Sequence, residues 1–173
     1  MRFRGLVYRA HNPRWNWSPP SGEGARRYGG RFNRAGVPAL YTSLSPLTAM
    51  REASPIGRPL QPITLCAYEV DAEPVFDALD SSQLEARGLV EEELRCPNWE
   101  REMLAGIIPA SQRLADWLIT AGYVGMRVQS FAPGAGTNDL NLVLWRWGNQ
   151  LPGKVVLVDD EERLSKDSFS GTS

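Results

Sequence analysis

The spacing of the β-favouring segments is the feature that most constrains the fold of this chain. Short runs rich in aliphatic, aromatic and β-branched residues alternate with turns rich in glycine and proline, which is typical of strands. Helical patterns separate only some of these runs, without a regular strand–helix–strand alternation. This irregular order favours an α+β fold over a doubly wound one. The expected strands are residues 6–10, 39–42, 63–70, 74–77, 123–131, 141–145 and 155–158.

Three segments carry helix signals. Ser45-Pro46 predicts a helix start, with serine as the N-cap and proline at the first helical position, and the proline-rich residues 55–62 end that helix. Residues 80–94 and 110–121 are the other two expected helices, and residues 99–104 are expected to form one more helical turn. Residues 11–28 follow neither period, so we expect a long ordered loop there, and loops of this length are often functional.

Length and composition favour one soluble globular domain. The chain has 173 residues, 42% of them hydrophobic and 23% charged. We expect a single domain over residues 1–158, followed by a polar, flexible tail over residues 159–173.

Charge and cysteine usage exclude several classes of protein. A net charge of −1 leaves no excess of positive charge for binding nucleic acid by counterion release. His11 is the only histidine, which makes a zinc site or a serine–histidine triad a poor expectation, so no metal is expected. Cys66 and Cys96 lack CxxC spacing, and the chain shows no signal peptide or membrane-spanning run. These features favour a cytoplasmic protein with free thiols.

One block, residues 29–53, places an arginine, a tyrosine and a carboxylate close together in sequence. Arg31 follows two glycines at the edge of an expected strand, Tyr41 lies in the next strand, and Glu52 lies two turns into the helix. Arginine grips phosphate, tyrosine offers a flat ring, and a carboxylate stabilises a developing oxocarbenium ion. A dinucleotide such as NAD has features that suit all three.

Each residue of the block also has a plain structural interpretation. Arg31 fits a structural ion pair, Tyr41 fits the core, and Glu52 fits an exposed helix face. When each residue is considered singly, the sequence pattern favours its structural interpretation.

The block resembles the signature of RES-domain proteins, the toxins of RES–Xre toxin–antitoxin modules. The similarity rests on Gly30-Arg31-Phe32-Asn33, on Ala39-Leu40-Tyr41-Thr42-Ser43 and on Glu52-Ala53. The family is named for an arginine, a glutamate and a serine, which Arg31, Glu52 and Ser130 match here. Within the family, the chain is most similar to the ParS–ParT branch.

The resemblance implies an ADP-ribosyltransferase-like fold, with a split mixed or antiparallel sheet and flanking helices around an NAD cleft. It implies NAD+ as a substrate that is cleaved at the nicotinamide–ribose bond. It also implies an Xre-type (ParS-type) antitoxin as the partner, which blocks the cleft and carries the DNA binding, and a protein target for ADP-ribosylation.

The resemblance also assigns roles to residues of this chain. Arg31, helped by Arg9, is expected to hold the NAD phosphates, and Tyr41 to pack on the nicotinamide ring. Glu52 is expected to orient the ribose and stabilise the transition state, and Ser130 to hydrogen-bond nicotinamide or a phosphate.

Three functions remain open from the sequence. The first is a toxin that transfers ADP-ribose to a protein such as phosphoribosyl pyrophosphate synthetase. The second is a glycohydrolase or phosphorylase that depletes NAD, because no Glu-x-Glu motif stands at a strand end to support transfer. The third is a non-catalytic module that binds a nucleotide or a partner through Trp15, Trp17 and the arginine-rich loop.

Overall fold

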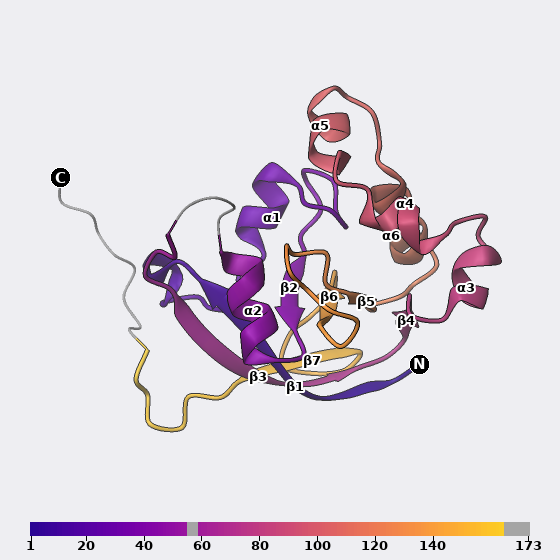
Figure 1. The fold of residues 1–173 in the computed structure, drawn as a ribbon. Coiled ribbons are helices and arrows are strands. Elements are labelled where there is room, and N and C mark those ends of the chain that lie inside the picture. Colours follow the sequence, from indigo (N-terminus) through magenta and orange to yellow (C-terminus); the bar gives the residue numbers. More distant parts are fainter. Residues whose placement is uncertain (55–58, 165–173) are drawn as a thin grey trace.

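A single mixed sheet organises the computed structural model, which describes residues 1–54 and 59–164 (Figure 1). Its seven strands follow the order β4-β5-β6-β2-β1-β3-β7. Neighbouring strands are antiparallel except β4 and β5, which are parallel. The expected α+β class with a mixed sheet is confirmed. The strands are β1 (Phe3–His11), β2 (Leu40–Ser43), β3 (Thr64–Ala72), β4 (Val75–Asp77), β5 (Gly125–Gln129), β6 (Leu140–Leu144) and β7 (Gly153–Leu157).

The sheet is nearly divided between its central strands β1 and β2. β1 pairs with β3 along its whole length, from Phe3 to His11, and all four residues of β2 pair with β6. In contrast, β1 and β2 share one residue pair, Tyr8 with Ser43. Two half-sheets, β4-β5-β6-β2 and β1-β3-β7, therefore diverge from this single contact.

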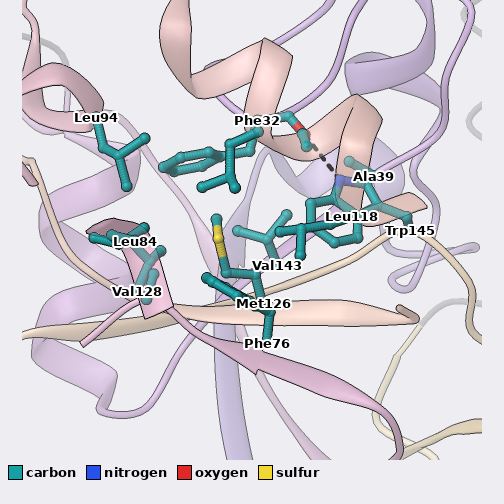
Figure 2. Close-up of a cluster of buried hydrophobic side chains, with 13 residues drawn as sticks. Phe32, Ala39, Phe76, Leu84, Leu94, Leu118, Met126, Val128, Val143 and Trp145 are labelled. Atoms are coloured by element: carbon teal, nitrogen blue, oxygen red, sulfur yellow. Dashed lines mark hydrogen bonds between the residues drawn. The ribbon is translucent and has the colours of Figure 1, made fainter. Parts of the chain in front are cut away.

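Two hydrophobic clusters lie on opposite faces of the sheet, because alternate residues of β6 belong to different clusters. One is built around β4, β5 and the helix α6 (Ala110–Thr120), with Phe76, Met126 and Leu118 at its centre (Figure 2). The other joins β1 and β3 to the inner residues of β2 and β6, including Tyr68 and Leu40. Both clusters bury their side chains almost fully, and the second includes strands of both half-sheets, so burial of apolar area there holds the two halves together.

Helices lie toward two regions of the sheet. The helix α2 (Pro46–Ala53) packs on β1 and touches β2, and Figure 1 shows the helices α3 to α6 gathered toward the β4 end. The short helices are η1 (Pro13–Trp15), α1 (Glu23–Tyr28), α3 (Ser81–Glu85), α4 (Glu91–Arg95) and α5 (Trp99–Leu104).

The start of α2 agrees with its sequence signal. The Ser45 hydroxyl accepts a hydrogen bond from the Thr48 N–H at 3.1 Å, and Pro46 is the first helical residue. Farther along the helix, Thr48 and Arg51 both bind Asp139, at 2.6 and 2.7 Å, just before β6 begins. These contacts fix α2 against the other half of the sheet.

Two expectations about helices were wrong. The loop expected over residues 11–28 contains the helices η1 and α1, and the single helix expected over residues 80–94 is two short ones, α3 and α4. Helix α1 lacks a side-chain cap, and Gly24 lies within it, so it carries few helix signals. In the second case Gly88, with φ of 66°, turns the chain between the two helices.

The carboxyl-terminal segment folds back on the domain as far as it is described. Asp159 accepts hydrogen bonds from the N–H groups of Arg163 and Leu164, and Leu164 packs against the cluster of β1 and β3. Residues 165–173 of the expected tail, and residues 55–58 of the expected proline-rich turn, lie outside the described part.

Two smaller expectations concern thiols and membranes. Cys66 and Cys96 are both free, as expected. Within the described ranges, the chain forms no helix with the length and apolar character needed to span a membrane.

Candidate active site

A cavity of about 280 Å³ lies at the point where the two half-sheets diverge. Its walls come from α2 on one side and from β1, β2 and β6 on the other. The lining residues are Tyr8, Arg9, Ala10, Tyr41, Thr42, Ser43, Ala49, Glu52, Ala53 and Asn141. The cavity thus collects three of the five residues that the sequence singled out: Arg9, Tyr41 and Glu52.

Glu52 is the only acidic residue among those lining residues, and two donors hold its carboxylate. Oε1 accepts a hydrogen bond from the Ser130 hydroxyl at 2.6 Å and from the Asn141 amide Nδ2 at 2.5 Å. No described residue donates a hydrogen bond to Oε2. The side chain as a whole is exposed, so one carboxylate oxygen is anchored and the other is available to a ligand.

Ser130 stands behind Glu52 and outside the cavity lining. It directly follows the last residue of β5, is 1% exposed, and its oxygen also accepts a hydrogen bond from the Ala132 N–H at 3.2 Å. A hydroxyl in this position orients the carboxylate. Ser130 is not among the residues that line this cavity.

Tyr41 lines the cavity, and its hydroxyl bonds to the turn at residues 30–33. The hydroxyl donates to Asn33 Oδ1 at 2.7 Å and accepts from the Phe32 N–H at 3.0 Å. Burial raises the pKa of this hydroxyl, so it remains a donor at neutral pH. Tyr41 therefore ties the cavity wall to the turn that carries Arg31.

That turn spans residues 30–33, and buried side chains brace its backbone. Gly30 and Asn33 form an isolated bridge, the Gln112 amide donates to both of their carbonyl oxygens, at 2.9 and 3.1 Å, and Trp145 Nε1 donates to the Phe32 carbonyl at 2.8 Å (Figure 2). Gly30 is required because a Cβ there would lie 2.6 Å from the Tyr41 hydroxyl oxygen. Arg31 is therefore held in a tight turn, which corrects its expected place at a strand edge.

The Arg31 guanidinium lies beside the cavity, in a cage of carbonyls and rings. Nη1 donates to the carbonyl oxygens of Leu94 and Cys96, each at 2.9 Å, and the group lies 5.5 and 5.1 Å from the ring centroids of Trp99 and Phe131. No described residue accepts a hydrogen bond from Nε or Nη2, so these N–H groups remain available to an anion.

Arg9 lines the cavity from β1 and is also anchored through Nη1. That nitrogen donates to the carbonyl oxygens of Pro19 and Ser21, at 3.1 and 2.7 Å. Burial lowers the pKa of both Arg9 and Arg31, yet a guanidinium keeps its proton at neutral pH. The neighbourhood of Glu52 thus holds two fixed positive charges.

Three features of the site were missed from the sequence. Asn141, Asn33 and Gln112 each make side-chain hydrogen bonds that shape it. One sequence feature could have drawn attention to Asn141 as a site residue: it is a polar residue at the start of an otherwise apolar strand. Trp15 and Trp17, which the sequence offered as part of a binding module, pack on each other with ring centroids 6.3 Å apart and are not among the residues that line this cavity.

Comparison with known proteins identifies the family. A family model described as the RES domain matches residues 6–167, nearly the whole chain, whereas no curated protein matches. RES domains have an ADP-ribosyltransferase-like fold, with which the mixed sheet and flanking helices agree, and they are associated with NAD-utilising toxins. The chain belongs to the RES-domain family.

Proposed function

We propose that this protein is a cytoplasmic toxin that cleaves the nicotinamide–ribose bond of NAD+ and transfers ADP-ribose to a protein. The observation that carries the proposal is Glu52, whose Oε1 is held by two donors while the carboxylate borders a cavity between the two half-sheets. An anchored carboxylate with a free oxygen suits a reaction that develops positive charge on a sugar.

In the proposed reaction, the C1′–N bond of NAD+ breaks and nicotinamide leaves with the bonding electron pair. Positive charge then develops on the ribose ring, and Glu52 stabilises this oxocarbenium-like state. A nucleophile on the acceptor protein forms the new bond to C1′ and loses its proton. Because the carboxylate is already oriented, it needs no rearrangement as the charge appears.

The other residues have roles in binding and orientation. Arg9 and Arg31 supply fixed positive charge for the pyrophosphate, and the open N–H groups of Arg31 suit a phosphate oxygen. The ring of Tyr41 offers a flat surface to nicotinamide. We assign Ser130 to holding Glu52, because its buried hydroxyl donates to that carboxylate.

The proposed partners follow from family membership. We propose an Xre-type antitoxin, as in the ParS–ParT branch, which blocks the cavity and supplies DNA binding. The toxin has a net charge of −1, which gives it little attraction to nucleic acid of its own. Phosphoribosyl pyrophosphate synthetase is the first candidate for the acceptor protein.

The test incubates the purified chain with adenine-labelled NAD+ in a cell lysate. Glu52→Gln keeps the shape and removes the charge, and Glu69→Gln, an exposed position on β3, is the matched control. We expect Glu52→Gln to lower kcat for nicotinamide release by roughly 10²–10³ with little change in KM, and Glu69→Gln to behave as the parent. Equal kcat for the parent and Glu52→Gln would contradict the role of Glu52.

NAD hydrolysis is the second candidate. Among the residues that line the cavity, Glu52 is the one acid, so no second carboxylate there is placed to activate a protein acceptor. Nicotinamide release without a labelled protein band would establish this alternative. NAD+ binding with no release of nicotinamide would instead indicate a binding module.

A further inference from the structure

Asn141 faces the candidate catalytic carboxylate from β6. Its Nδ2 lies 2.5 Å from Glu52 Oε1, although the two residues are 89 positions apart in the chain. The family signature of arginine, glutamate and serine does not include this residue. Its contact with Glu52 is as close as that of Ser130, at 2.6 Å.

Ser43 holds the oxygen end of the Asn141 amide, and Glu52 takes the nitrogen end. The two residues lie directly opposite each other in the antiparallel pairing of β2 with β6. The Ser43 hydroxyl donates to Asn141 Oδ1 at 2.7 Å and is 2% exposed. Because an ionised carboxylate can only accept hydrogen bonds, Glu52 takes the amide nitrogen, and the Ser43 hydroxyl donates to the amide oxygen that remains.

The donors also restrict which conformations Glu52 can adopt. An exposed glutamate on a helix of eight residues would otherwise sample several rotamers. Asn141 from β6 and Ser130 from the end of β5 approach the same oxygen, Oε1, which leaves Oε2 as the free one. A chain of contacts from Ser43 through Asn141 thus sets the direction of the carboxylate.

We propose that Asn141 is a positioning residue for the reaction at Glu52, and that Ser43 holds its amide in place through the amide oxygen. The proposal deepens the proposed NAD+ cleavage and rests on it for its catalytic consequence. Asn141 acts on Glu52, and through it on the transition state, so its loss lowers kcat more than it changes KM.

Four variants test the proposal by nicotinamide release from NAD+. Asn141→Ala removes the donor, and Asn141→Asp keeps the size and the acceptor for Ser43 but turns a carboxylate toward Glu52. Ser43→Ala removes the donor that holds the amide oxygen of Asn141. Asn149→Ala changes an exposed asparagine in the loop between β6 and β7.

We expect both Asn141 variants to lower kcat by about 10- to 100-fold with KM within about threefold, because a hydrogen bond to a charged group is lost. Ser43→Ala should lower kcat by about 3- to 10-fold and Asn149→Ala should leave it unchanged. Parent-like kcat in Asn141→Asp would overturn the proposal, since filling the space would then be sufficient. A loss confined to KM would overturn it as well.

A second measurement separates this inference from the proposed function. The side-chain NH₂ signal of Asn141 in a ¹H–¹⁵N spectrum is assigned by its absence in Asn141→Asp. We expect Glu52→Gln and Ser43→Ala to move this signal and leave that of Asn149 in place. If the Asn141 signal has the same position in Glu52→Gln as in the parent, the contact is refuted. If the signal moves in Glu52→Gln but the parent releases no nicotinamide from NAD+, the contact is supported and NAD+ cleavage is refuted.

Discussion

Two buried tyrosine hydroxyls give the sharpest stability test of this structure. The Tyr41 hydroxyl makes two hydrogen bonds, to Asn33 Oδ1 and from the Phe32 N–H. The Tyr68 hydroxyl is also buried and has no hydrogen-bond partner among the described residues. The same change, tyrosine to phenylalanine, should therefore have different consequences at the two positions.

The expected cost of Tyr41→Phe follows from the groups it leaves unpaired. Asn33 is fully buried and Phe32 is 4% exposed, so water cannot readily replace the lost hydroxyl. Each buried polar group without a partner costs about 1–3 kcal/mol, so the two together should lower the free energy of unfolding by about 2–6 kcal/mol. For a chain of this size that is a fall in Tm of roughly 4–24 °C.

Tyr68→Phe is the matched control. It removes a buried hydroxyl that makes no bond, so the free energy of unfolding should stay within about 1 kcal/mol of the parent or rise. Urea unfolding followed by circular dichroism measures both variants, with an unchanged m-value as the sign that the same transition is compared. If Tyr41→Phe costs no more than Tyr68→Phe, the hydrogen bonds of Tyr41 do not brace the turn that carries Arg31.

Two further predictions concern backbone space and pH. Gly30→Ala should lower the free energy of unfolding by about 1–3 kcal/mol, because its Cβ would press on Tyr41, whereas Gly24→Ala, in open space on α1, should raise it by up to about 1 kcal/mol. Arg2 lowers the pKa of Asp71 to about 2, so the stability from this pair is present above about pH 4 and is lost as the pH falls toward 2. The Tm difference between Asp71→Asn and the parent should therefore shrink over that range, and the prediction fails if it is constant.

Much of the local structure could be predicted because its causes lie within a few residues. The start of α2 depends on Ser45 and Pro46, which are adjacent to each other and to the bonds they affect. β2 was recognisable from its composition alone. The helix α1 was missed because it carries few local signals: it has six residues, no side-chain cap and an internal glycine.

The candidate site could be predicted only in part. Arg31, Tyr41 and Glu52 were found because they lie within one short block that resembles the RES signature. The cage around Arg31 was not predictable, because it uses the backbone carbonyls of Leu94 and Cys96, and every residue has a carbonyl. No residue type marks such an acceptor in a sequence.

The sequence by itself determined the α+β class, most of the strands, the start of α2 and the residue types available for chemistry. Only the tertiary structure decided which of these residues meet. Asn141 reaches Glu52 across 89 positions because β6 pairs with β2 in the register that sets it opposite Ser43. A register shift of one residue would turn Asn141 to the opposite face of the sheet. The contact therefore depends on long-range pairing and packing, which no local pattern encodes.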